Sequence, residues 1–557
     1  VINYAVVHLD GRLAILVNDP TGFSILSNKS GLIFGKIFSN AGQRANLESL
    51  SDLVCSGHAL ETVLVSQHWG NYISVSRDEA GMKLFRDPSG GLPCYYAMVD
   101  GMTIFTSDVP NLVLAGFLKP AVDTVAVGRA LYFSQLSVEK TAISGVTQLL
   151  PGHCLAITDH EATADQRWCP WDYSVANSSE AQETRVERLR AVIQSTHAAW
   201  ASCYPRPLVG LSGGLDSSIV AICLAEASAE VGCFTAITPD VVGDERLYAQ
   251  MVCDQIGVDL IEEEYAIAAI ELGKSVAEGV PVPNGKAHEM AYNRSVRTAA
   301  AQTQADAFFV GAGGDNVFYL THSARPIVDR YLAEGLSNGL RSTVSDICAI
   351  TGASLWQVLL EAIQVPIRGR AAAQAWRVDA DYLDPEYIEI AACEVPSHPW
   401  LAAPSNVSYG KLGHVAMILR AMTHVEHRDK QLPIPMISPL LSQPIVEACL
   451  SIPSWEACQG GVDRSAARRA FSSSLPSKVV GRHGKGSPDG FVGDFIIRNR
   501  EEIADRLLHG HLARNRLINR TAIEVALRPD GQIRRNDCAR FMELLDAEAW
   551  IDHWSSL

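Results

Sequence analysis

The sequence has few of the features that mark membrane, secreted or nucleic-acid-binding proteins. No stretch approaches the ~18 consecutive apolar residues of a membrane-spanning helix, and the start, Val1-Ile2-Asn3, shows no basic segment leading into a long apolar core. The 13 cysteines include no C-x-x-C pair, which disfavours a zinc site or a disulfide framework. The formal net charge of −16 disfavours a nucleic-acid partner. We therefore expect a soluble cytoplasmic protein that binds neither nucleic acid nor a membrane.

What is present indicates a folded chain of more than one domain. Of the 557 residues, 47% are hydrophobic and 19% are charged, as in globular proteins. Short strand-like runs fill the first part, and Asp100-Gly101 between two of them predicts a hairpin. The stretch Cys169–Thr184 is polar and lacks a period, so we expect a linker there. The predicted domains are residues 1–175, rich in β-strands, and residues 185–557, which begin with an alternating α/β pattern and end mostly in helices.

The segment "PLVGLSGGLDSSIVAICLAEA", Pro207–Ala227, places small and polar residues between a strand-like and a helix-like run. Glycines allow a tight turn, and the N-terminus of a helix carries partial positive charge, so this arrangement suits a phosphate group. The segment has neither the lysine of the Walker motif nor the G-x-G-x-x-G spacing. A tight turn with a capping aspartate is the alternative, but seven consecutive residues of fitting chemistry, residues 212–218, favour phosphate binding.

A second glycine loop follows another apolar strand-like run, in "DAFFVGAGGDNVF", residues 306–318. Ligands of open α/β sheets bind beyond the carboxyl ends of the strands, so Asp216 and Asp315 are expected to converge on one crevice. Two carboxylates beside a phosphate site are suited to hold Mg²⁺. The alternative for Asp315 alone is a helix N-cap.

These motifs occur in the order "LSGGLDSS", "FTAI", "DERLYAQ" and "GAGGDNVF". With them the chain resembles the asparagine synthetase superfamily, whose synthetase domain is an N-type ATP pyrophosphatase. The segment "LFRDPSGGLPCYYAMVDGMTIFTSDVPNLV" is similar to the glutaminase-like domain of that superfamily. The resemblance implies an α/β protein with an N-terminal glutaminase-like (Ntn-type) αββα domain and a C-terminal ATP pyrophosphatase domain that ends in a helical part.

The resemblance also implies ATP and Mg²⁺ as cofactors, with Asp216 and Asp315 as the metal ligands. The residues that it implies for nucleotide binding are Leu211, Ser212, Gly213, Gly214, Asp216, Ser217, Ser218, Thr235, Gly311 and Gly313.

The chain departs from the superfamily at two places. Glutamine-hydrolysing members use an N-terminal cysteine, whereas the first cysteine here is Cys55, so we expect no release of ammonia and an amine that belongs to another substrate. β-Lactam synthetases and their carbapenam relatives place a tyrosine three residues before the second aspartate, where this chain has Ala312. The segment Pro439–Phe491 is instead very similar to lasso peptide macrolactam synthetases.

This closer resemblance implies that ATP activates an Asp or Glu side chain of a core peptide, and that the peptide's own α-amine then closes an isopeptide ring. It implies Lys485 and Arg482 as catalytic residues, and as partners the lasso precursor peptide, the leader peptidase and the leader-recognition protein of the same pathway. A glutamine-independent amide synthetase of a small molecule remains an alternative, either β-lactam synthetase-like or ammonia-dependent and asparagine synthetase-like. A binding scaffold with a vestigial nucleotide site is a second alternative, which the intact Asp216, Asp315 and Lys485 disfavour.

The peptide pocket is expected in the helical region after residue 320. Arginines in this region could contact the peptide, although solvated helix faces explain them as well. They are Arg325, Arg330, Arg341, Arg368 and Arg370.

Overall fold

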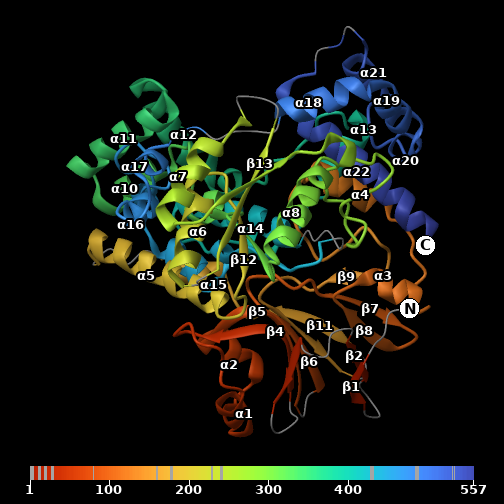
Figure 1. Cartoon of the computed structure of the whole chain (residues 1–557). Coiled ribbons are helices and arrows are strands. Elements are labelled where there is room, and N and C mark those ends of the chain that lie inside the picture. Colours follow the sequence, from red (N-terminus) through yellow and green to blue (C-terminus); the bar gives the residue numbers. More distant parts are fainter. Residues whose placement is uncertain are drawn as a thin grey trace. The chain divides into compact units, whose positions relative to one another are not determined.

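The computed structural model describes residues 5–9, 14–17, 22–26, 31–78, 81–158, 161–175, 180–227, 230–238, 243–426, 432–482, 484, 489–529, 531 and 533–557 (Figure 1). The chain divides into two compact units. The first consists of Val1–Cys94 and Leu149–Trp168, and the second of Tyr95–Gln148 and Cys169–Leu557.

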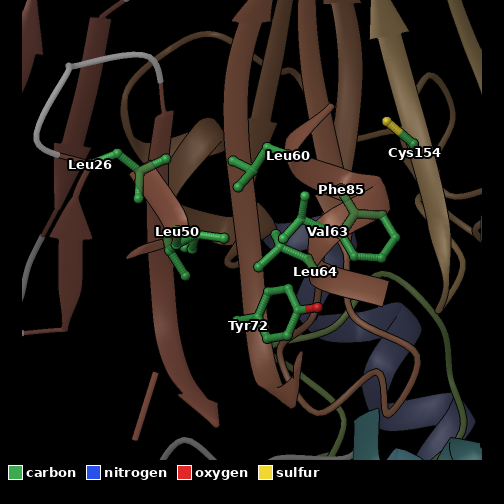
Figure 2. Packing of buried hydrophobic residues seen from close by; sticks show 9 residues of the cluster. Leu26, Leu50, Leu60, Val63, Leu64, Tyr72, Phe85 and Cys154 are labelled. Atoms are coloured by element: carbon green, nitrogen blue, oxygen red, sulfur yellow. The ribbon is translucent and has the colours of Figure 1, made fainter. Parts of the chain in front are cut away.

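The first unit is built on a six-stranded antiparallel sheet in the order β11-β10-β6-β5-β4-β3. Its strands are β3 (Phe23–Ile25), β4 (Gly31–Ser39), β5 (His68–Asp78), β6 (Gly81–Arg86), β10 (His153–Ile157) and β11 (Ala162–Gln166), with β1 (Ala5–Leu9) and β2 (Ala14–Val17) as a separate pair. Helices α1 (Leu47–Cys55) and α2 (Leu60–Gln67) supply apolar side chains to one core with the sheet, which Figure 2 shows. Leu50 and Leu64 from the helices and Tyr72 from β5 are almost fully buried there. This is the β-rich region that the sequence predicts.

The second unit contains a parallel five-stranded sheet in the order β14-β13-β12-β15-β16. Its strands are β12 (Pro207–Gly210), β13 (Gly232–Ile237), β14 (Leu260–Glu264), β15 (Ala307–Val310) and β16 (Met436–Ile437). From β12 the chain first adds strands on one side and then returns to add β15 and β16 on the other. The order of strands therefore reverses between β12 and β15, the place where open α/β sheets bind ligands.

Helices cover both faces of this sheet because its strands carry apolar side chains on both sides. Val296, Ala299 and Ala300 of α8 (Glu289–Thr303) pack with Leu208, Phe234 and Phe308 on one face. On the other face, Cys233 of β13 contacts Cys253 of α7 (Arg246–Ile256). Helix α6 (Leu215–Ala227), which also contacts the sheet, is buried from Leu215 to Leu224.

The remaining elements of the second unit are mostly helical, as the sequence predicts for its C-terminal part. They are β7 (Tyr95–Val99), β8 (Met102–Thr106), α3 (Val109–Leu114), α4 (Thr124–Tyr132), β9 (Thr147–Gln148), η1 (Pro170–Tyr173), α5 (Gln182–Ala201), η3 (Ile267–Ala269), α9 (Gly314–Val317), α10 (Arg325–Glu334), α11 (Asn338–Thr351), α12 (Leu355–Gln374), α13 (Pro385–Cys393), η4 (Pro399–Leu401), α14 (Tyr409–Glu426), η5 (Pro439–Leu441), α15 (Gln443–Ser451), η6 (Ser454–Ala457), α16 (Ser465–Phe471), α17 (Ser477–Val480), α18 (Asp489–Arg498), α19 (Arg500–His509), α20 (His511–Arg514), α21 (Arg520–Ala526) and α22 (Arg535–Ser556).

No single helix among the described residues is long and apolar enough to cross a membrane. Helices α11 and α12 meet the length and composition criteria only when taken together, and they are bent against each other by 110°.

Two features differ from the sequence-based expectation. Residues 95–148, which were expected in the first domain, belong to the second compact unit, although β7 and β8 do form the predicted hairpin with positive φ at Asp100 and Gly101. The expected linker Cys169–Thr184 is also partly structured, because Pro170–Tyr173 forms a 3₁₀ helix that buries Trp171 and α5 begins at Gln182. An aromatic side chain in a polar stretch was the overlooked sign of packing.

Candidate active site

The first glycine loop lies between β12 and α6 and is held by its own serines. The hydroxyls of Ser212 and Ser217 form a hydrogen bond of 3.1 Å, and the backbone N–H of Ser212 also donates to the Ser217 hydroxyl at 3.2 Å. Gly213 has a φ of +61° and lies so close to Tyr248 that a Cβ would overlap the tyrosine. The loop is therefore preformed around the N-terminus of α6, as the phosphate-binding hypothesis requires.

The second glycine loop, between β15 and α9, packs directly against the first. A Cβ on Gly311 would lie 2.6 Å from the backbone nitrogen of Ser217, so only glycine allows this approach. Gly314 is packed in the same way against the side chain of Asp216. Asp216 and Asp315 are thereby brought to one crevice, as the sequence predicts.

Arg464 joins the two carboxylates. Its Nη1 donates to Asp216 Oδ2 at 2.8 Å and also to Asp315 Oδ1, while its Nε donates to Asp463 Oδ1 at 2.6 Å. Burial opposes the charge of this guanidinium, but the attraction of Asp216, Asp315 and Asp463 outweighs it and raises the pKa of Arg464. Arg464 itself has a φ of 50°, an uncommon backbone conformation for a residue with a side chain.

Arg482, one of the two proposed catalytic residues, is fixed against the first loop. It donates to the Ser212 carbonyl oxygen at 3.0 Å and to Glu245 Oε1 at 2.7 Å, and its guanidinium lies 4.2 Å from the ring centre of Tyr248. Arg482 therefore holds the loop directly at Ser212 and also through Tyr248, which packs on Gly213. The other proposed catalytic residue, Lys485, lies outside the described residues.

These groups surround a cavity of about 920 Å³ at the carboxyl ends of the strands, a size within the range of small-molecule sites. Most of the predicted site residues line it, namely Leu211, Ser212, Gly214, Asp216, Ser217, Thr235, Gly311, Gly313, Asp315 and Arg482. Gly213 and Ser218 do not line it. Gly213 is covered by Tyr248, and the side chain of Ser218 is fully buried.

The far wall of the cavity comes largely from residues that sequence analysis did not select. Tyr265, Glu289, Tyr292 and Asn293 line it, together with Leu320, His322, His424 and the segment 432–436. Tyr265 and Tyr292 lie with their ring centres 6.0 Å apart. Burial raises the pKa of Tyr265 to about 12, with a smaller contribution from the charges of Glu245 and Glu289. This wall therefore draws on residues both before and after residue 320. The peptide pocket expected after residue 320 stays a prediction.

The five arginines considered for peptide contact do not line the cavity. Four of them bind groups of the helical region itself. Arg325 donates to the Ala373 carbonyl, Arg330 pairs with Glu334, Arg368 pairs with Glu361, and Arg370 donates to the Pro404 carbonyl. These contacts favour a structural role.

In the first unit, the segment "RDPSGGLP" holds a buried loop. Arg86 is fully buried and donates to three carbonyl oxygens, those of Leu92, Leu149 and Gly90. Asp87 accepts from the backbone N–H groups of Tyr72 and Ser89. The charged side chains of Arg86 and Asp87 thus bind backbone carbonyl and N–H groups of this loop and its neighbours.

Comparison with known proteins agrees with these two parts. Residues 207–552 match the family model for asparagine synthase, which covers more than half of the chain. The chain belongs to the asparagine synthase family. Residues 62–169 match the glutamine amidotransferase domain. The predicted fold class is thereby confirmed.

No curated protein matches the chain closely enough to count as a relative. One solved structure that it matches is described as the allosteric regulatory enzyme of purine biosynthesis. The match has 13% identity and a TM-score of 0.18 and covers 43% of this chain. It spans 61% of the length of that structure's chain.

Among the functional residues that sequence analysis missed, Arg464 had a recognisable signal. It stands in "QGGVDRSAARRAF", where two glycines and an aspartate precede a short helix. Its two partners, Asp216 and Asp315, lie 248 and 149 positions away in the chain, so no local pattern could join them.

Proposed function

We propose that the protein is an ATP-dependent, AMP-forming ligase and, more closely, a lasso peptide macrolactam synthetase. In the first step, a side-chain carboxylate oxygen of the peptide attacks the α-phosphorus of ATP, which forms an acyl-adenylate and releases pyrophosphate. In the second, the peptide's α-amine attacks the acyl carbon, the amine loses a proton, and AMP leaves with the bonding electron pair. Adenylation is needed because a carboxylate and an amine at neutral pH form a salt and no amide.

The observation that carries the proposal is the cavity beside Ala312. Ala312 lines the cavity at the position where the synthetases that close small β-lactam rings carry a tyrosine. A methyl group there leaves space, and the cavity continues from the glycine loops to the wall formed by Tyr265 and Tyr292. A volume of about 920 Å³ supports a second substrate in addition to the nucleotide. The similarity of Pro439–Phe491 to lasso synthetases supports the same conclusion.

The phosphates of ATP are proposed to bind at Ser212, Gly214 and Ser217, whose loop is held by Arg482. The residues present also suit Mg²⁺, because Asp216 and Asp315 each place an oxygen within hydrogen-bonding distance of one nitrogen of Arg464. When bound, Mg²⁺ would neutralise phosphate charge. Asp216 and Asp315 would hold it, and Arg464 would then turn to other anions of the site.

Lys485 remains a proposed catalytic residue. It directly follows Gly484, which lines the cavity. A lysine ammonium beside the adenylate would stabilise the negative charge that develops as the amine attacks. The proposed partners are the precursor peptide, the leader peptidase and the leader-recognition protein, and the proposed location is the cytoplasm.

The test is peptide-dependent AMP and pyrophosphate release by the purified chain. Synthetic peptides with a free α-amine and one Asp or Glu at stepped positions would be supplied with ATP and Mg²⁺, and the products weighed by mass spectrometry. The proposal expects a product lighter by one water in which the α-amine is blocked. Lys485→Met should bind ATP and lose ring formation. AMP formation only with small carboxylates plus ammonia, or with a small amino acid that closes on itself, would replace the proposal with the small-molecule alternative.

A further inference from the structure

Glu289 differs from the other acidic residues that line the cavity. The others are Asp216, Asp315, Asp463 and Glu245, and each of them is paired with Arg464 or Arg482. Glu289, in the first turn of α8, donates its backbone N–H to the Lys286 carbonyl oxygen, but its side chain makes no hydrogen bond or ion pair with any of the described residues. The cavity therefore has one half-buried carboxylate whose charge is not balanced by the part of the protein that the structure describes.

The surroundings of Glu289 favour a positively charged ligand. Tyr265 and Tyr292 line the wall beside it, and burial raises the pKa of both hydroxyls, which therefore stay neutral. Asp546, behind this wall, adds no positive charge. A carboxylate that is partly removed from water costs free energy unless a cation or hydrogen-bond donor pairs with it.

The position at which β-lactam synthetases carry a tyrosine offers no group for the amine in this chain. Ala312, in the second glycine loop, has neither an acid nor a hydroxyl with which to hold one. Glu289 lies on a different element, in the same cavity as both glycine loops. A cation bound at Glu289 would therefore share an enclosure with the carboxylate that is activated at the loops.

We propose that Glu289 is the binding site for a primary ammonium group, the amine substrate of the ligase. This inference rests on the proposed function in that it takes the ammonium to be the peptide's N-terminus. Glu289 binds the ammonium by charge and hydrogen bonding, and it places the nitrogen on the adenylate side of the cavity. It is a binding residue for this one substrate group and does not take part in adenylation.

The binding test uses two small probes, glycylglycinamide, which carries an ammonium, and its N-acetylated form, which does not. Binding to the full chain would be followed by ligand-observed NMR in the presence of a non-hydrolysable ATP analogue. A charge-assisted contact should give wild type about a tenfold preference for the ammonium probe. Glu289→Gln should lose the preference and Glu289→Asp should keep part of it.

The matched control is Glu264→Gln, the same change at an exposed residue that ends β14 and does not line the cavity. It should keep the wild-type preference. An unchanged preference in Glu289→Gln would overturn the proposal. A wild-type protein that shows no preference for the ammonium probe would also overturn the proposal. This includes the case in which Lys485 pairs with Glu289, so that the preference appears only in the Lys485→Met variant.

A second measurement separates this inference from the proposed function. With a peptide that the protein cyclises, Glu289→Gln should still release pyrophosphate but accumulate uncyclised peptide and AMP from hydrolysed adenylate. Normal cyclisation by this variant would overturn the inference and leave the proposed function intact. Ammonium binding that depends on Glu289, in a protein that cyclises no peptide, would support the ammonium site and overturn the peptide assignment.

Discussion

At the scale of single residues, Arg464 allows the carboxylates of the two glycine loops to lie close together. Asp216 is buried and Asp315 is about one-third exposed, and both form an ion pair with the same nitrogen, Nη1 of Arg464. Two carboxylates this close repel each other unless a cation lies between them. A divalent cation and Arg464 would therefore compete for the same two oxygens.

The prediction is that Arg464→Gln makes the fold depend on divalent cations. Without the guanidinium, the two carboxylates are left unpaired, and the free energy of unfolding should fall by about 3 kcal/mol in EDTA. Addition of Mg²⁺ should raise the thermal midpoint of the variant more than that of wild type, where Arg464 competes. Calorimetry with EDTA and with Mg²⁺ measures this. Equal Mg²⁺ effects in the two proteins would contradict it. The control is Arg469→Gln in α16, whose guanidinium binds Gln459 and Glu183 and neither glycine loop.

Gly311 provides a second residue-scale prediction. Gly311→Ala would place a methyl group 2.6 Å from the Ser217 nitrogen, so the two loops would have to separate. We expect ATP affinity to drop at least about tenfold while the fold persists, because the strain is confined to the loops. Isothermal titration with an ATP analogue is the measurement. The control is Gly493→Ala, at a glycine outside the cavity lining whose added Cβ would meet only the Cys538 sulfur, at an ordinary contact distance of 3.7 Å. An unchanged affinity in Gly311→Ala would show that the loops do not need this contact.

At the scale of elements, α22 supports the wall of the cavity through one buried acid. Asp546 is fully buried and accepts from the Ser275 hydroxyl at 2.7 Å and from the backbone N–H of Val276 at 2.8 Å. Val276 itself lines the cavity. The C-terminal helix thereby fixes a segment that lies 270 positions earlier in the chain.

Asp546 should make stability fall with rising pH. Burial raises its pKa from 3.8 to about 7, against the hydrogen bonds from Ser275 and Val276, and the charges of Glu289 and Glu543 add to the rise. The folded chain then holds a proton that the unfolded chain releases. The stability that Asp546 contributes is full below pH 3.8 and is lost as the pH rises to about 7.

Asp546→Asn removes this dependence, since an amide has no proton to lose. Relative to wild type, the variant should gain up to about 4 kcal/mol in the free energy of unfolding between pH 4 and pH 7. Urea unfolding at a series of pH values measures the difference. A difference that is flat with pH would contradict the assignment.

Local elements were predictable because their signals are local. Leu208–Leu211 gave the strand and Ser217–Ala227 the helix around the first loop, and the structure has β12 at Pro207–Gly210 and α6 at Leu215–Ala227. The far wall was not predictable. Tyr265 and Glu289 come from a strand end and a helix start without any motif, and only the packing of α8 on the sheet brings them to the cavity.

At the scale of the whole molecule, the thiols report on the packing of both units. None of the 13 cysteines, all of which lie within the described residues, forms a disulfide, and they are distributed over the first and second units. Cys55 and Cys393 are exposed, whereas burial raises the pKa of Cys94, Cys154, Cys449 and Cys458 to about 12. Since the thiolate is the reactive form, reactivity should follow burial.

The last prediction follows from this contrast. At pH 8 the native chain should react fastest with Ellman's reagent at Cys55 and Cys393, and more slowly at the half-buried Cys169, Cys203 and Cys348. The eight buried thiols should not react, because they are covered. Cys55→Ser and Cys393→Ser should each remove one fast-reacting thiol. In 6 M guanidinium without reductant (roughly the concentration that unfolds even very stable domains), all 13 thiols should react. A smaller number of reactive thiols would reveal a disulfide that the fold does not contain.

Fast reaction of Cys94 or Cys154 in the native chain would show that the first unit opens, and fast reaction of Cys449 or Cys458 would show that the second unit opens. Mass spectrometry of the labelled peptides assigns each thiol, so the experiment tests the packing of each unit separately.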